Sequence, residues 1–137
     1  MRLIRAMNYK VIDAMRPHLI ADRDYPLDQM ANDLKLYMRA RPDEFLALTL
    51  WEATELRAFI LAYIPPGRKH LYIVQAWADD VPKEEAELLF EEAKRFAKEH
   101  ELSEIRAETI RSPEAFARRW GFETYSTIIA YKLNGEL

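Results

Sequence analysis

The sequence predicts a single α+β domain in which a mixed, mostly antiparallel twisted sheet carries helices on both faces. Three strand-like apolar runs follow one another through short connections, and amphipathic helices stand before and after this block in the sequence. The 137 residues contain no low-complexity stretch, fixed-period repeat or long linker. We therefore expect one domain that spans residues 1–137.

The N-terminal part predicts a short strand and two helices. Residues 2–7 alternate in part and fit an edge strand, and Asn8 is a suitable cap for the helix that follows. Pro17 predicts a kink or a break in that first helix. A second helix begins after Tyr25-Pro26 and ends at Pro42. The apolar positions of the two helices are Val11, Ile12, Met15, Leu19 and Ile20, then Leu27, Met30, Ala31, Leu34, Tyr37 and Met38.

The middle of the chain predicts an antiparallel meander of strands over residues 45–51, 56–64 and 70–77. Apolar and aromatic residues occupy both alternating faces of these runs, which is typical of central strands covered on each side. The connections over residues 52–55 and 65–69 have the length and chemistry of hairpin turns.

A long helix follows the meander. Pro82 opens it, and its apolar stripe continues to about His100. The stripe consists of Ala86, Leu89, Phe90, Ala93, Phe96 and Ala97.

The C-terminal part predicts a strand, a short helix and a last strand. Apolar residues at 105, 107 and 109 alternate with charged ones, the pattern of a strand with one wetter face. Ser112-Pro113 can cap a short helix through Trp120, and Gly121 stands where a left-handed C-terminal residue is expected. Residues 124–133 read as one final strand.

Composition excludes several classes of function. Without cysteine, the chain has no disulfide, iron–sulfur cluster or thiol nucleophile, and a cytoplasmic location is the default expectation. The net charge of −3 gives no attraction for nucleic acid or an anionic membrane, and no uncharged run is long enough to span a bilayer. Three isolated glycines exclude a Walker loop or dinucleotide fingerprint. The three histidines are too scattered to suggest a metal site.

The predicted order of elements, together with Trp120-Gly121-Phe122-Glu123 between the short helix and the final strand, resembles the GNAT superfamily of acetyl-CoA-dependent N-acetyltransferases. The resemblance covers nearly the whole chain and implies the acyl-CoA N-acyltransferase fold. In this family the fourth strand, here residues 70–77, lies along the pantetheine arm of acetyl-CoA. The next helix holds the pyrophosphate at its start, and the acetyl group passes directly to an amine.

The chain departs from the family pattern where the pyrophosphate would bind. The family carries a basic, glycine-rich loop there, whereas residues 79–85 contain no glycine, and Pro82 removes a backbone donor. Between Asp79 and Glu87 the sequence has five acids and one base, Lys83. Acids at a helix N-terminus stabilise the unliganded helix and repel an anion from the same place.

The catalytic positions depart as well. Ala117 stands where many members carry a tyrosine that protonates the leaving thiolate, and Ser112 is nearest to a familiar asparagine. The fourth strand has no carboxylate to act as base. Glu108 is the best-placed replacement base, although a solvated surface acid is the ordinary interpretation of such a residue.

The resemblance places Gln75, Ala76 and Trp77 beside the pantetheine arm. The Gln75 amide could bind a cofactor amide or satisfy another polar group of the protein. Trp77 could line the acyl pocket, plug it, or pack in the core.

Two functional readings follow. The first is a divergent GNAT-like protein with weak or lost acetyl-CoA-dependent activity and a binding or structural role. The alternative is an active small acetyltransferase for an unknown amine, in which Lys83 and main-chain donors of Val81, Glu84 and Glu85 hold acetyl-CoA. A protein partner or a homodimer is compatible with either reading.

Overall fold

The computed structural model describes residues 1–20, 24–108, 123–125 and 128–133. Its elements confirm the predicted succession of a strand, helices, a three-strand meander, a long helix and C-terminal strands. In chain order they are β1 (Arg2–Arg5), α1 (Val11–Met15), the 3-10 helix η1 (Arg16–His18), α2 (Leu27–Ala40), the 3-10 helix η2 (Pro42–Glu44), β2 (Phe45–Glu52), β3 (Glu55–Tyr63), β4 (His70–Ala78), α3 (Lys83–Glu99), β5 (Glu104–Glu108), β6 (Glu123–Tyr125) and β7 (Ile128–Lys132).

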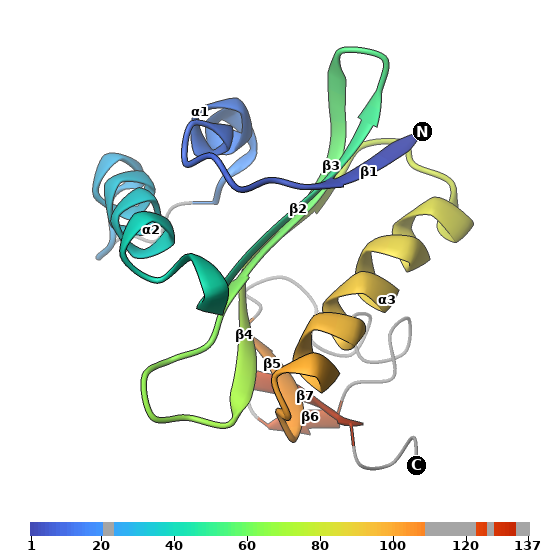
Figure 1. Cartoon of the computed structure of the whole chain (residues 1–137). Coiled ribbons are helices and arrows are strands. Elements are labelled where there is room, and N and C mark those ends of the chain that lie inside the picture. The colour runs from blue at the N-terminus through green and yellow to red at the C-terminus, as the bar shows by residue number, and fades with distance from the viewer. Residues whose placement is uncertain (21–23, 109–122, 126–127, 134–137) are drawn as a thin grey trace.

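The strands of the described residues form one sheet in the order β1-β2-β3-β4-β5-β7-β6. Neighbours are antiparallel except β4 and β5, which run parallel. A parallel pair needs a crossover connection, and α3 provides it. Figure 1 shows β2, β3 and β4 as a long twisted ribbon, with β5, β6 and β7 gathered at one end. The mixed sheet of the prediction is therefore confirmed.

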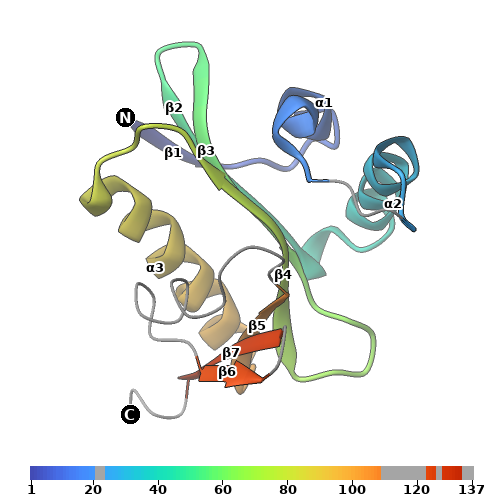
Figure 2. The same cartoon turned by 180° about the vertical axis from the view of Figure 1, so that it is seen from behind.

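Helices cover both faces of the sheet. Helices α1 and α2 lie on one face and α3 lies on the other, as Figure 2 shows from behind. Two separate clusters of buried side chains correspond to these two layers. The cluster under α1 and α2 contains Ile12, Met15, Met30, Leu34, Met38, Phe45, Ala47, Phe59 and Leu61.

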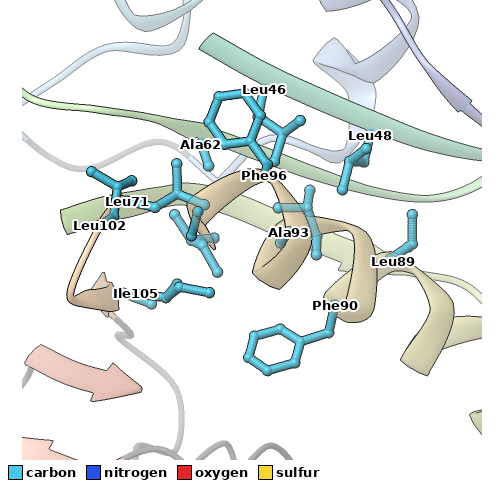
Figure 3. Close-up of a cluster of buried hydrophobic side chains, with 14 of the residues drawn as sticks. Leu46, Leu48, Ala62, Leu71, Leu89, Phe90, Ala93, Phe96, Leu102 and Ile105 are labelled. Atoms are coloured by element: carbon cyan, nitrogen blue, oxygen red, sulfur yellow. The ribbon is translucent and has the colours of Figure 1, made fainter. Parts of the chain in front are cut away.

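The second cluster fixes α3 on the sheet (Figure 3). Ala93 and Ala97 are fully buried, and their small side chains allow the helix to approach the strands closely. Burying each large apolar side chain contributes about 1.5–3 kcal/mol. The start of α3 is thereby held beside the end of β4. The cluster includes Leu46, Leu48, Leu71, Ile73, Leu89, Phe90, Phe96 and Ile105.

The first helix is shorter than the sequence predicted. It ends at Met15, and the 3-10 helix η1 follows with Pro17 at its start. Leu19 is already extended, so Leu19 and Ile20 do not continue the helix. Proline explains the change because it removes a backbone donor and crowds the preceding turn. Asn8 does accept a hydrogen bond from the Lys10 N–H, at 2.9 Å, before the first turn.

Two further expectations for the C-terminal part need correction. The single last strand is a hairpin, β6 and β7, which places β7 rather than β6 beside β5. Glu104, expected on the wetter face of its strand, is only 5% exposed. Its two carboxylate oxygens pair with Arg106 and Lys132, which explains how a charge is tolerated there. The predicted helix through Trp120 and the turn at Gly121 lie outside the described residues.

Candidate functional site

The parallel strands β4 and β5 separate halfway along β4. Their pairing runs from His70 opposite Glu104 to Ile73 opposite Ala107, while β4 continues to Ala78. Glu108, the next residue of β5, is registered with Ile128 of β7 and has no partner on β4. Within the described residues, the second half of β4 therefore has β3 on one side and no strand on the other. This half of β4, residues 74–78, is called its open half below, because the described strands leave that side without a neighbour.

A β-bulge marks the point of separation. On β3, Leu61 is opposite Gln75 and the next residue, Ala62, is opposite Ile73, so Val74 is an extra residue on β4. A bulge bends its strand and changes the alternation of side chains. Val74 packs against the cluster under α1 and α2, and the Gln75 side chain reaches the same layer. The bulge thus both bends β4 and turns two consecutive side chains toward α1 and α2.

The Gln75 amide is occupied by the backbone of Ile20. Its Oε1 accepts the Ile20 N–H at 3.0 Å, and its Nε2 donates to the Ile20 carbonyl at 3.0 Å. Nε2 also lies 3.6 Å from the sulfur of Met30. Gln75, which the sequence analysis considered as a partner for a cofactor amide, therefore connects β4 to the segment after η1.

Trp77 lies on the same face of the sheet, against His18. The two rings stack at 3.7 Å between centroids with an angle of 14°, and Phe59 lies 5.7 Å from the Trp77 ring. Trp77 is half-buried and Ala76, which alternates with it, is exposed. The end of β4 is thus covered on the α1 and α2 side by an aromatic pair. Sequence reasoning did not single out His18 for this position, because the two residues are far apart in the chain.

The junction between β4 and α3 is held by Arg57 of β3. The Asp79 N–H donates to the Arg57 carbonyl at 2.9 Å. The Arg57 guanidinium donates to the Asp79 carbonyl through Nη2 at 2.8 Å and through Nε at 3.2 Å, and Nη2 lies 3.5 Å from the Asp80 carbonyl. Asp80 has a φ of 49°, which places it in the left-handed region. The loop therefore makes its turn without glycine.

In the first turn of helix α3, some backbone N–H groups donate within the helix and others do not. Pro82 caps it, and its carbonyl accepts the N–H groups of Glu85 at 3.0 Å and Ala86 at 3.1 Å. Among the described residues, the N–H groups of Lys83 and Glu84 have no backbone acceptor. Of the predicted donors, Glu85 is thus already used by the helix.

The side chains of this junction make it strongly acidic. Asp79, Asp80, Glu84 and Glu87 are exposed. The Lys83 ammonium lies 3.9 Å from the Glu87 carboxylate.

Glu108, the predicted base, ends β5, and its side chain lies outside what the structure describes. Ser112 and Ala117 lie outside the described residues as well. Groups of three or more His, Cys, Asp or Glu side chains arranged to hold a metal are absent from the part of the chain that the structure describes. In that same part, no helix combines the length and apolar character needed to cross a membrane.

A second charged cluster lies at the opposite end of β4 and β5. Burial alone raises the pKa of Glu104, but hydrogen bonds from Lys132 and Arg106 outweigh it and hold the pKa below its ordinary value. His70 has its pKa lowered by burial and by the nearby Arg106. These contacts stabilise the paired half of β4 and β5 and lie away from the open half.

No protein-family model matches the chain, and no curated protein matches it. Several solved structures match over almost the whole length of both chains. A GNAT-family protein from Desulfovibrio desulfuricans aligns with a TM-score of 0.74 at 12% identity, over 96% of this chain and 98% of its own. PaiA N-acetyltransferase from Thermoplasma acidophilum, in complex with coenzyme A, gives 0.69 at 14% identity, over 96% and 99%.

A third similar structure is the ribosomal-protein-alanine N-acetyltransferase from Escherichia coli, with a TM-score of 0.70 at 11% identity over 96% of this chain and 93% of its own. These likenesses confirm the fold class that the sequence predicted. The chain has the GNAT fold, with the separation of β4 and β5 at its centre.

Proposed function

We propose that this chain is a GNAT-fold protein with weak or lost acetyl-CoA-dependent activity that acts as a binding or structural module. The observation that carries this proposal is the charge at the start of α3. Five acids stand between Asp79 and Glu87, against Lys83 as the one base of that segment. The nearby Arg57 directs its guanidinium to loop carbonyls.

The residues of the junction do not fit a pyrophosphate. Two like unit charges at 4 Å repel by about 1 kcal/mol in water and about 4 kcal/mol at an effective dielectric constant of 20. The helix dipole attracts an anion by only about 0.3–1 kcal/mol at an exposed end. Several exposed acids at comparable distances from a phosphate would therefore outweigh the dipole. In this proposal the open half of β4, by contrast, is where the amide groups of a pantetheine arm would pair.

Calorimetric titration of the purified chain with acetyl-CoA, coenzyme A and acetyl-pantetheine tests the proposal. Acetyl-pantetheine lacks the pyrophosphate, so it reports on the open edge of β4 alone. We expect acetyl-CoA to bind no better than acetyl-pantetheine. Titration up to about 1 mM should give little or no heat, and the Tm should not rise. Dissociation constants for acetyl-CoA of about 1–100 µM, near ordinary substrate levels, would overturn it.

An active acetyltransferase is the second candidate function, and the separation of β4 and β5 favours it. In this reading, the main-chain donors of Val81 and Glu84, together with Lys83, hold acetyl-CoA, and Glu108 or a water accepts the proton of an amine. Acetyl transfer to a panel of primary amines, followed as thiol release, measures this activity. Replacement of Glu108 by Gln should then lower turnover about tenfold or more, since a general base contributes about 10²–10⁴ in rate. An unchanged rate would remove Glu108 from the proposal.

A further inference from the structure

We infer that Arg57 is a positioning residue for the β4–α3 junction, which it holds in a conformation that presents backbone donors to an anion. This inference rests on the proposed function, because it treats the charge of the junction, rather than its shape, as the obstacle to a pyrophosphate. Arg57 contributes from β3, outside residues 79–85, the segment that was compared with the pyrophosphate loop of the family.

The backbone contacts of Arg57 determine where the loop N–H groups point. Its guanidinium donates to the carbonyls of Asp79 and Asp80 on one side of the loop. The described peptide bonds are trans, so each N–H points opposite to the carbonyl of the same peptide group. The N–H groups of Asp80 and Val81 therefore point away from β3. They find no backbone acceptor among the described residues.

Arginine can hold the loop carbonyls because its planar guanidinium carries several donors in a rigid arrangement. Its side chain is only 16% exposed, and Nη1 lies 3.6 Å from Glu52 and 3.8 Å from Glu55 at the β2–β3 turn. The carbonyls of the loop thus accept hydrogen bonds from one side of the guanidinium, while two exposed acids lie near the other side. A lysine has a single donor centre and cannot span the same groups. The backbone turn at Asp80, which a glycine would adopt freely, is thereby maintained by a side chain from the neighbouring strand.

The consequence is that neutralising acids is sufficient to create a binding site, without the insertion of glycines. We expect the variant Asp79→Asn/Glu84→Gln/Glu85→Gln to bind coenzyme A with a dissociation constant of about 1–100 µM. In this background, Arg57→Met should raise the dissociation constant about tenfold or more, and Arg57→Lys should do the same. If Arg57→Lys binds as well as Arg57, only its charge matters and the inference is wrong.

Two matched comparisons separate positioning from other effects. Arg95→Met removes a cation from the exposed face of α3 and should leave the dissociation constant within about twofold. In the Arg57→Met background, Asp80→Gly should restore binding better than Asp80→Ala, because both remove the same charge but only glycine adopts a positive φ freely. Equal effects of Gly and Ala would contradict a positioning role.

A readout without ligand keeps the inference distinct from the proposed function. If the neutralised variant does not bind coenzyme A, the charge explanation fails, and Arg57 is judged by amide hydrogen exchange in the native chain. Arg57→Met should then speed exchange of the Asp79 amide about tenfold or more, whereas Arg95→Met should not. Unchanged exchange at Asp79 would overturn the inference.

Discussion

The side chain of Gln75 pairs with Ile20 as a neighbouring strand would, accepting its N–H and donating to its carbonyl, each at 3.0 Å. This pairing joins β4, at its bulge, to the segment that follows η1. The stack of His18 on Trp77 lies two residues away on each chain segment. The connection after α1 is thus attached to the open half of β4 at two points, one polar and one aromatic.

Replacement of Gln75 by Leu should lower the free energy of unfolding by about 1–3 kcal/mol, because both backbone groups of Ile20 lose their partner in a partly buried place. Urea denaturation measures the change. Gln29→Leu is the matched control, since Gln29 is the other glutamine of the chain and is exposed on α2. A loss of equal size in both variants would show that the Gln75 contact with Ile20 contributes nothing.

Removal of the His18 ring should also destabilise the fold, through its contact with Trp77. A parallel aromatic pair contributes about 0.5–1.5 kcal/mol beyond simple burial. We expect His18→Ala to lose about this amount and His18→Phe to retain most of it, because phenylalanine preserves the flat ring without the polar nitrogens. Thermal unfolding of the two variants checks the prediction. Equal Tm values for Ala and Phe would mean that stacking is irrelevant.

Glu104 makes the stability of the protein depend on pH. A carboxyl whose pKa is lower in the folded state than in the unfolded state adds stability above its unfolded pKa, here an ordinary value of 4.5. That stability is lost as the pH falls through the folded pKa. We expect Glu104→Gln to cost about 1–3 kcal/mol at pH 7, and to flatten the fall in unfolding free energy as the pH drops through and below the ordinary carboxyl value of 4.5.

The control for this pH effect is Glu91→Gln. Glu91 is exposed on α3 and pairs with the largely buried Lys94 at 2.9 Å, and an ion pair with an exposed partner contributes about 0.2–1 kcal/mol. Chemical denaturation at several pH values compares the two variants. If both show the same pH profile as the native chain, Glu104 is not the group that titrates.

Most of the described strands and helices are predictable from the sequence because their signals are local. The stripe from Ala86 to Ala97 repeats with the period of a helix, and all of its predicted members are buried. The division of the last strand into β6 and β7 is not predictable, because residues 124–133 contain none of the glycine, proline or asparagine that mark a hairpin turn. The break of the first helix was signalled by Pro17, although not its position.

The site was less predictable because its contacts join distant parts of the chain. Arg57 binds carbonyl groups, which any residue supplies, so no residue pattern announces the contact with Asp79. His18 and Trp77 meet only after the sheet and the first helix have formed. Glu104 is buried because β7 brings Lys132 to it. The acidic character of the β4–α3 junction, in contrast, is predictable from the sequence, because its acids lie close together between positions 79 and 87.

The turn between β2 and β3 offers a stabilising substitution. Glu52 and Glu55 are paired, so Ala53 and Thr54 form a two-residue loop, and Ala53 has a φ of 54°. A positive φ at the first central position favours glycine, whereas alanine there costs about 1–2 kcal/mol through contact of its Cβ with the following carbonyl. Replacement by glycine should raise the free energy of unfolding by less than this amount, because glycine loses more conformational freedom on folding.

We therefore expect Ala53→Gly to raise the free energy of unfolding by about 0.5–1 kcal/mol. The same substitution at Ala14, an exposed position within α1, should lower it by about 0.5–1 kcal/mol, because a helical φ gives glycine no advantage. Urea titration of the two variants beside the native chain measures both signs. A loss of stability at Ala53 would show that the left-handed conformation of this turn is not maintained in solution.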